Sequence, residues 1–273
     1  MIEYEIKPDE KFSFGFKELW NYRELFYFFT LRDIKVKYKQ AFLGFLWAIL
    51  QPLTMMIVFT FIFSKGLKLS SEGMPYPIFA LSGLLIWNIF SNGLLNSANS
   101  MVSNANIIKK IYFPRLIIPI SSILTTLVDF SFALITFFMI VLFYHPSINF
   151  LQLIICLPLS IIITVITTFG LGSFLSSLNV KYRDFQYIIP FLIQFLLFVN
   201  PVLYSSKIFE SKTANFVMTL NPIAGAINLM RTPFLGLPID WSQVLLNIFI
   251  SIIFLLIGIY TFRKTEAYFA DLV

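Results

Sequence analysis

The chain is organised around a short basic stretch, Asn104-Ala105-Asn106-Ile107-Ile108-Lys109-Lys110-Ile111-Tyr112-Phe113-Pro114-Arg115, which separates two long apolar segments. Those segments are too apolar to remain in water, whereas the stretch between them places cations beside apolar side chains. A basic connection of this kind is typical of the cytoplasmic side of a membrane protein. The pattern predicts a chain that crosses a membrane before residue 104 and again after residue 115.

The composition supports this interpretation. Of the 273 residues, 58% are hydrophobic and only 12% are charged, whereas soluble chains carry about 25% charged residues. The apolar residues form blocks of about 20 rather than alternating strands of about ten, which favours spanning helices over a barrel. We therefore expect an all-α polytopic membrane protein whose residues 1–273 form a single transmembrane domain.

Several other classes of protein are disfavoured. Residues 1–11 mix acidic and basic side chains without an apolar core, so no cleaved signal peptide is expected. Cys156 is the only cysteine, which excludes an intrachain disulfide and a thiolate metal cluster. The net charge of +6 is not gathered in a polar domain with stacking aromatics, so it indicates membrane orientation rather than nucleic-acid binding.

The blocks of low charge predict six spans, at about 42–64, 78–98, 117–143, 151–178, 185–203 and 242–262. In the fourth span, Gly170 and Gly172 predict close packing against another helix. Residues 207–235 are more polar, and we expect two short re-entrant helices there that dip into the outer leaflet and return. Counting this block as a seventh span would put the termini on opposite sides. With six spans, most of the 20 Lys and Arg residues lie inside, which favours two cytoplasmic termini.

Residues 13–39 alternate apolar and charged side chains at helical spacing, which predicts a helix lying in the cytoplasmic membrane interface. The charged residues near its end are Arg32, Asp33, Lys35 and Lys37. Anionic membrane lipids attract each such cation by roughly 1 kcal/mol. Two interpretations stay open, a simple anchor and a direct part in handling substrate.

The sequence lacks the motifs of a catalyst. A nucleotide-binding phosphate loop ends in Gly-Lys-Ser/Thr, and no Gly in this sequence is followed by Lys. One His, one Cys and a single carboxylate in the predicted spans do not make a metal site, and no Gly-x-Ser-x-Gly motif is present. We therefore expect no enzyme activity and no cofactor bound by this chain.

Asp129 is the one carboxylate within the predicted spans. An ionisable group inside a membrane is costly and by default indicates function. The alternative is a structural carboxyl group, either protonated or hydrogen-bonded to Ser and Thr neighbours such as Thr125 or Thr126. An ion-gradient transporter that uses Asp129 would need a proton relay, and the sequence shows none.

Aromatic residues make up 18% of the chain, and a few lie near the ends of predicted spans. Tyr38, Phe42, Trp47 and Trp87 are placed to line a path for sugars, which stack on aromatic rings, with Asp129 beside them. The competing interpretation is an ordinary belt of aromatic residues at the membrane interface.

Five motifs occur in order along the chain: Arg32-Asp33-Ile34-Lys35-Val36-Lys37-Tyr38-Lys39-Gln40 with Leu43-Gly44 and Trp47-Ala48, Gln51-Pro52, the stretch 104–115, Leu178-Asn179-Val180 through Tyr182-Arg183-Asp184, and Asn221-Pro222. With these motifs the chain resembles the membrane permeases of ABC-2 type polysaccharide exporters. The likeness is closest to the O-antigen exporter permeases, and the capsular polysaccharide and teichoic acid permeases are related. It covers nearly the whole chain after the first dozen residues.

The resemblance implies a homodimer in a bacterial inner membrane that pairs with two ATP-binding cassette subunits, which hold ATP and magnesium. The cargo would be a lipid-linked polysaccharide. The family's coupling helix falls on residues 101–115, where the contact residues would be Asn104, Ile107, Ile108, Lys109, Lys110, Ile111, Tyr112, Phe113 and Arg115. A second contact falls on Lys181, Tyr182, Arg183 and Asp184, and the outer gate falls on Asn221 and Pro222. A sugar-modifying membrane enzyme is a further alternative, but the loops lack clustered acids.

Overall fold

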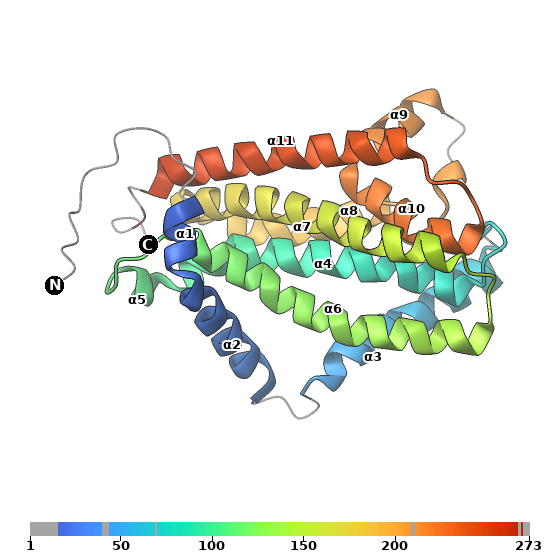
Figure 1. Cartoon of the computed structure of the whole chain (residues 1–273), viewed down its shortest axis with the longest axis horizontal. Helices are drawn as coiled ribbons and strands as arrows, with labels where there is room; N and C mark the ends of the chain where they lie inside the picture. Colours follow the sequence, from blue (N-terminus) through green and yellow to red (C-terminus); the bar gives the residue numbers. More distant parts are fainter. Residues whose placement is uncertain (1–15, 40–43, 69, 209–210, 267–268, 270–273) are drawn as a thin grey trace.

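The structure, a computed structural model, describes residues 16–39, 44–68, 70–208, 211–266 and 269. Its elements are helical (Figure 1), which confirms the predicted all-α class. Five helices are long and apolar enough to cross a membrane: α3 continued by the π-helix η1 (Leu46–Gly66), α4 (Tyr76–Ser103), α6 (Ile117–Tyr144), α7 (Phe150–Lys181) and α11 (Trp241–Glu266). These five lie where five of the six spans are expected.

The remaining predicted span, at 185–203, contains a shorter helix. Helix α8 (Phe185–Val199) has 15 residues, which gives it a length of about 22 Å, compared with about 30 Å of hydrocarbon. The helix ends because Pro201 follows Asn200, and a residue before proline favours an extended backbone. The structure therefore has five helices of spanning length and one shorter apolar helix within the described residues.

Helix α4 lies in the middle of the bundle, antiparallel to α6 and parallel to α7 (Figure 1). In the most apolar 18-residue part of this helix, 83% of the residues are buried. A methyl group on Gly172 of α7 would lie 2.5 Å from Ser97 Oγ of α4, and one on Gly170 would lie 2.5 Å from the backbone of Phe254 in α11. The close packing predicted for Gly170 and Gly172 is thus confirmed, since neither position has room for a larger side chain.

One end of the bundle carries α1 (Phe16–Asn21), α2 (Arg23–Lys39) and α5 (Ala105–Ile108), as Figure 1 shows. Helix α2 leaves this end and slopes away from the long helices toward the start of α3. Its buried Phe29 packs on Phe113, with ring centroids 5.5 Å apart. Helices α1 and α2 occupy the range predicted for an interface helix, and their position at a membrane surface stays a prediction.

The opposite end carries the 3-10 helix η2 (Ser206–Ile208), α9 (Lys212–Leu220) and α10 (Pro222–Leu235). Two short helices therefore lie in the range 207–235 that was predicted to be re-entrant. Asn221 begins α10 as its N-cap, because its side-chain oxygen accepts from the backbone N–H groups of Ile223 at 3.1 Å and Ala224 at 3.4 Å. Their depth in a membrane stays a prediction.

Candidate functional site

A single coupling helix was expected at residues 101–115. The structure does not contain one. Helix α4 continues to Ser103, α5 is a single turn, and the chain after Ile108 is irregular up to the start of α6. The side-chain amide of Asn104 donates to Ser100 O at 2.8 Å, at the end of α4. Pro114 interrupts any continuation of the helix, since it lacks a backbone N–H.

The side chains of this stretch divide into two groups. Ile108 and Phe113 are buried in the chain's own core beside Phe29, with Ile107 packed against the same cluster. Arg115 Nη1 donates to the backbone oxygen of Glu266 and so ties this stretch to the end of α11. The exposed group consists of Lys109, Lys110, Ile111, which is 62% exposed, and Tyr112, which is 72% exposed. The apolar docking face predicted from Ile107, Ile108, Ile111 and Tyr112 is therefore not a single surface.

The turn between α7 and α8 contains the second set of predicted contact residues. Lys181, Tyr182, Arg183 and Asp184 are all exposed, and Lys181 Nζ lies 5.1 Å from the ring centroid of Tyr182. Helix α7 ends and α8 begins at the end of the bundle that also carries α5 (Figure 1). Two exposed basic loops thus lie at the same end of the molecule.

Asp129 of α6 contacts two residues of α2. Lys37 Nζ forms an ion pair with one carboxylate oxygen, and the Tyr38 hydroxyl donates to the other. Thr125 and Thr126 instead donate to backbone oxygens of their own helix, each at 3.1 Å. The expected bond from Thr125 or Thr126 to Asp129 was therefore wrong. Burial, followed by the hydrogen bond and the negative charge of Asp129, raises the pKa of the Tyr38 phenol, so Tyr38 stays a neutral donor.

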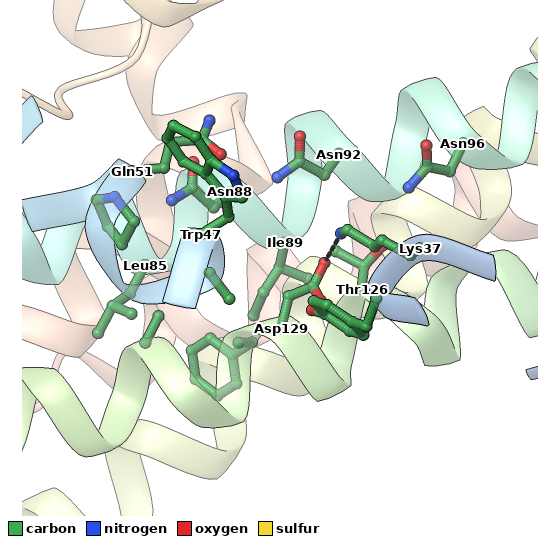
Figure 2. A pocket seen from close by; sticks show the side chains of 15 residues that line it. Lys37, Trp47, Gln51, Leu85, Asn88, Ile89, Asn92, Asn96, Thr126 and Asp129 are labelled. Atoms are coloured by element: carbon green, nitrogen blue, oxygen red, sulfur yellow. Dashed lines mark hydrogen bonds and ion pairs between the residues drawn. The ribbon is translucent and has the colours of Figure 1, made fainter. Parts of the chain in front are cut away.

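A cavity of about 170 Å³ lies beside this ion pair, between α2, α3, α4 and α6 (Figure 2). Its polar lining comes from Lys37, Tyr38, Gln51, Asn88, Asn92, Asn96, Thr126 and Asp129, and Trp47 adds an aromatic ring. We call it the amide cavity. Asn88, Asn92 and Asn96 follow one another at four-residue spacing, which aligns them on one face of α4.

A second cavity of about 280 Å³ adjoins the amide cavity, because Lys37 and Asn96 line both. Asn99 and Ser103 of α4 continue the same helix face along this second cavity. From Asn88 to Ser103 the polar face is about 22 Å long, at 1.5 Å per residue. It therefore connects the middle of α4 with the end of the bundle that carries α5.

The predicted glycan-path residues separate in the structure. Tyr38, Trp47 and Asp129 line the amide cavity together. Trp87 is 5% exposed and packs on Phe90 with centroids 5.6 Å apart, so it does not line the cavity. Phe42 lies outside the described residues. The sequence interpretation did not connect the amides of α4 with Asp129, because Asp129 comes from another helix.

The predicted interface residues take different roles. Arg32 pairs with Asp33 at 2.6 Å, and its guanidinium lies 4.8 Å from the ring centroid of Phe29. Arg32, Lys35 and Lys39 line a groove on another face of α2. Lys37 alone among these cations points to Asp129, as Figure 2 shows.

The predicted outer gate residues fix the start of α10. The Asn221 amide donates to Asn200 Oδ1 at 2.9 Å, which joins α10 to the end of α8, and Pro222 follows as the first helical residue. Close by lies Arg231, which the sequence interpretation did not single out. Arg231 is 2% exposed and donates to Pro201 O at 2.7 Å, Val202 O at 2.6 Å and Phe79 O at 3.1 Å.

Comparison with known proteins gives a consistent family. A model described as ABC-2 type transporter matches residues 24–235. The chain is 31% identical over 246 residues to an O-antigen export system permease protein RfbA of Klebsiella pneumoniae, which covers 89% of this chain and 93% of the relative. It is 28% identical to RfbA of Myxococcus xanthus, covering 80% of this chain and 83% of the relative. It is 24% identical to the polysialic acid transport protein KpsM of Escherichia coli, and this match covers 74% of this chain and 77% of the relative. This multi-pass membrane chain belongs to the ABC-2 type transporter family.

Proposed function

We propose that this chain is the permease of an ATP-driven exporter that moves a lipid-linked polysaccharide, most specifically an O-antigen, out of the cytoplasm across a bacterial inner membrane. The observation that carries the proposal is the 31% identity to an O-antigen export permease along 93% of that relative's length. Similarity to a polysialic acid transport protein keeps a capsular polysaccharide as the second cargo. A teichoic acid is a third candidate cargo.

The energy source of this exporter lies on a separate subunit. The sequence has no phosphate loop, so ATP and magnesium bind to two partner ATPases. The two exposed loops, 109–112 and 181–184, lie at one end of the bundle and offer cationic and aromatic contacts for that partner. Both the start of α1 and the end of α11 lie at the same end (Figure 1), in keeping with two cytoplasmic termini.

A homodimer would use apolar helix faces that the single chain leaves exposed. In the most apolar part of the segment formed by α3 and η1, only 6% of the residues are buried. Helix α8 also exposes four aromatic side chains, those of Tyr187, Phe191, Phe195 and Phe198. The spacing of these four residues places them on one face of α8. A second copy of the chain and membrane lipid together would cover these faces.

Ion coupling through Asp129 has less support. Its carboxylate is already paired with Lys37 and bonded to Tyr38, so it is not poised to exchange protons along a relay. A proton ionophore separates the two mechanisms, because it would abolish ion-coupled export and leave ATP-driven export intact.

Reconstitution tests the function directly. Vesicles that contain the permease and its ATPase are supplied with lipid-linked polysaccharide on the ATPase side, and a sugar-degrading hydrolase is placed on the other side. We expect ATP-dependent degradation of the polymer. Polymer that stays protected in the presence of ATP, with an intact complex in the vesicles, would contradict the proposal.

The docking loop is tested separately by the double substitution Lys110→Glu and Ile111→Asp. We expect the ATPase to bind about thirtyfold more weakly in co-purification and titration, the effect of losing roughly 2 kcal/mol at an interface. Leu67→Asp, an equally exposed position in the loop at the other end of the bundle, serves as the control and retains the ATPase. Equal binding by both variants would remove loop 109–112 from the interface.

A further inference from the structure

We infer that the amide cavity is a binding site for one uncharged sugar unit within a single protomer, in which Asn88, Asn92, Asn96 and Gln51 bond the hydroxyls and Trp47 contacts the ring. The inference rests on the proposed function, because it names where the exported glycan is held. It differs from a path formed only between two protomers, since every group comes from α2, α3, α4 and α6 of one chain.

The first argument is the state of the amides. Within the described part of the chain, the side chains of Asn88, Asn92 and Asn96 have no hydrogen-bond partner, although α4 is otherwise buried. By contrast, Asn99 of the same helix face accepts from Asn179 of α7 at 2.9 Å. An amide without a partner in an apolar environment is costly. Asn88 and Asn92 are partly buried and Asn96 is exposed, so their unpaired amides are open to a polar occupant of the cavity.

The second argument concerns charge. Among the described residues that line the amide cavity, the formally charged ones are Lys37 and Asp129, which are paired with each other. A phosphate or a lipid head group requires cations that are not already neutralised, and Lys35 and Lys39 offer such cations on another face of α2. An uncharged ligand is thus the better match.

The third argument concerns the kind of hydrogen bonds. Amide groups offer both donors and acceptors, and a sugar hydroxyl is also both a donor and an acceptor. Four amides around one space can therefore satisfy several hydroxyls of one ring. The half-exposed indole of Trp47, which Figure 2 places beside Gln51, supplies an apolar surface for the C–H face of that ring.

The size of the cavity limits the ligand to one unit. Pockets for drug-sized molecules measure about 300–1,000 Å³, whereas the amide cavity measures about 170 Å³. The adjoining cavity of about 280 Å³, reached past Asn96, provides space for the next unit toward the end with α5. Successive units of a chain would thus follow the polar face of α4.

Photo-cross-linking tests the site in the full chain with its ATPase, in cells that make the polymer. A benzophenone amino acid replaces Gln51 or Asn92, one position in each experiment. After irradiation, the purified permease is treated with phospholipase D, which removes the diol-bearing head group of phosphatidylglycerol, then with periodate, which cleaves vicinal diols, and it is labelled with a hydrazide. We expect diol-containing adducts at both positions. The control replaces Phe61, which is 69% exposed on the outer part of the same apolar segment, and is expected to form adducts that lack diols.

Gln51 is exposed on α3, so its replacement keeps the test valid should the Asn92 replacement fail to assemble. Adducts that contain only phospholipid at Gln51, an absence of adducts there, or diol-containing adducts of equal yield at Phe61 would overturn the inference. Failure of the proposed function looks different, because then the wild-type chain would support no export at all.

A second measurement uses Asn88→Leu combined with Asn92→Leu, which removes two amides from the lining. We expect the yield of diol-containing adduct at Gln51 to fall about tenfold or more, since lost hydrogen bonds weaken binding. Thr54→Val is the matched control, because Thr54 is exposed one turn from Gln51 and donates only to Leu50 O of its own helix. An unchanged yield in the double variant would exclude the amides as ligands.

Discussion

Two cations, Arg231 at one end of the bundle and Lys37 nearer the other, are held in opposite ways. Arg231 is buried, its guanidinium carbon lies 3.5 Å from the ring centroid of Phe79, and its nitrogens donate to three backbone oxygens and to Ser82 Oγ. Lys37 has a side chain that is 46% exposed, and one carboxylate, that of Asp129, is its ion-pair partner.

The difference indicates where the molecule is rigid. The bonds of Arg231 join α10, α4 and the segment after α8, so moving one of these elements breaks several bonds at once. The polar contacts between the described parts of α2 and α6 are one ion pair and one hydroxyl, both near the end of α2, and surface ion pairs contribute only about 0–1 kcal/mol. We therefore expect the outer end to move as a unit, and α2 to separate from α6 more readily.

Arg231→Leu is expected to have the largest effect on stability. It leaves the oxygens of Pro201, Val202 and Phe79 without their donor in a buried site, and each orphaned acceptor costs about 1–3 kcal/mol. We expect a total loss of about 3–5 kcal/mol, measured as a lower melting temperature of the detergent-solubilised protein. Lys212→Leu, at an exposed cation of α9, is the control. A melting temperature that falls equally in both variants would contradict the anchoring role of Arg231.

Gly83→Ala tests the same site from the opposite side. A methyl group on Gly83 would lie 2.6 Å from both Arg231 Nη2 and Val202 O. Overpacking of this kind costs about 1–3 kcal/mol. Gly66→Ala is the control, because the nearest atom to its added methyl group is 3.7 Å away. The comparison fails if Gly66→Ala lowers the melting temperature as much as Gly83→Ala does.

The sequence predicted the helical class, five of the helices and the close packing at Gly170 and Gly172, because apolar block length and small residues are local signals. It could not predict the partners of Asp129, since Lys37 lies 92 residues away and a one-dimensional pattern does not order helices in space. The local candidates Thr125 and Thr126 were chosen for that reason. Their hydroxyls are instead satisfied by the backbone of the preceding turn.

The predicted coupling helix shows a second limit. Ile107, Ile108, Ile111 and Tyr112 have helical spacing, and this pattern favoured a single exposed face. In the structure the helix ends after Ile108. Ile108 and Phe113 are buried in the core, because α2 places Phe29 beside them. Likewise, Arg231 looked like a loop cation, and only the converging carbonyl groups of two other segments explain its burial.

Exchanging the charges of the inner pair tests whether Lys37 and Asp129 act as a structural contact. Asp129→Asn alone is expected to cost about 1–2 kcal/mol, since it removes the ion pair with Lys37 and weakens the hydrogen bond from Tyr38, and to reduce export. The double variant Lys37→Asp with Asp129→Lys is expected to restore most of the export, measured as polymer on the cell surface. Lys35→Asp with Asp129→Lys is the mismatched control. Restored export by the exchanged pair would also exclude a proton relay at residue 129.

Tyr38→Phe is expected to have the smallest effect, because it removes one hydrogen bond, worth about 0.5–1.5 kcal/mol, and keeps the ring. The pKa of Tyr38 is higher in the folded protein than the ordinary 10.0, so its contribution to stability is complete below pH 10 and is lost as the pH rises toward the folded-state pKa. The melting temperature of the wild type should therefore fall more steeply above pH 10 than that of Tyr38→Phe, with Tyr27→Phe, at an exposed position of the same helix, as the control. Parallel curves for the wild type and Tyr38→Phe would mean that the Tyr38 hydroxyl does not hold α2 on Asp129.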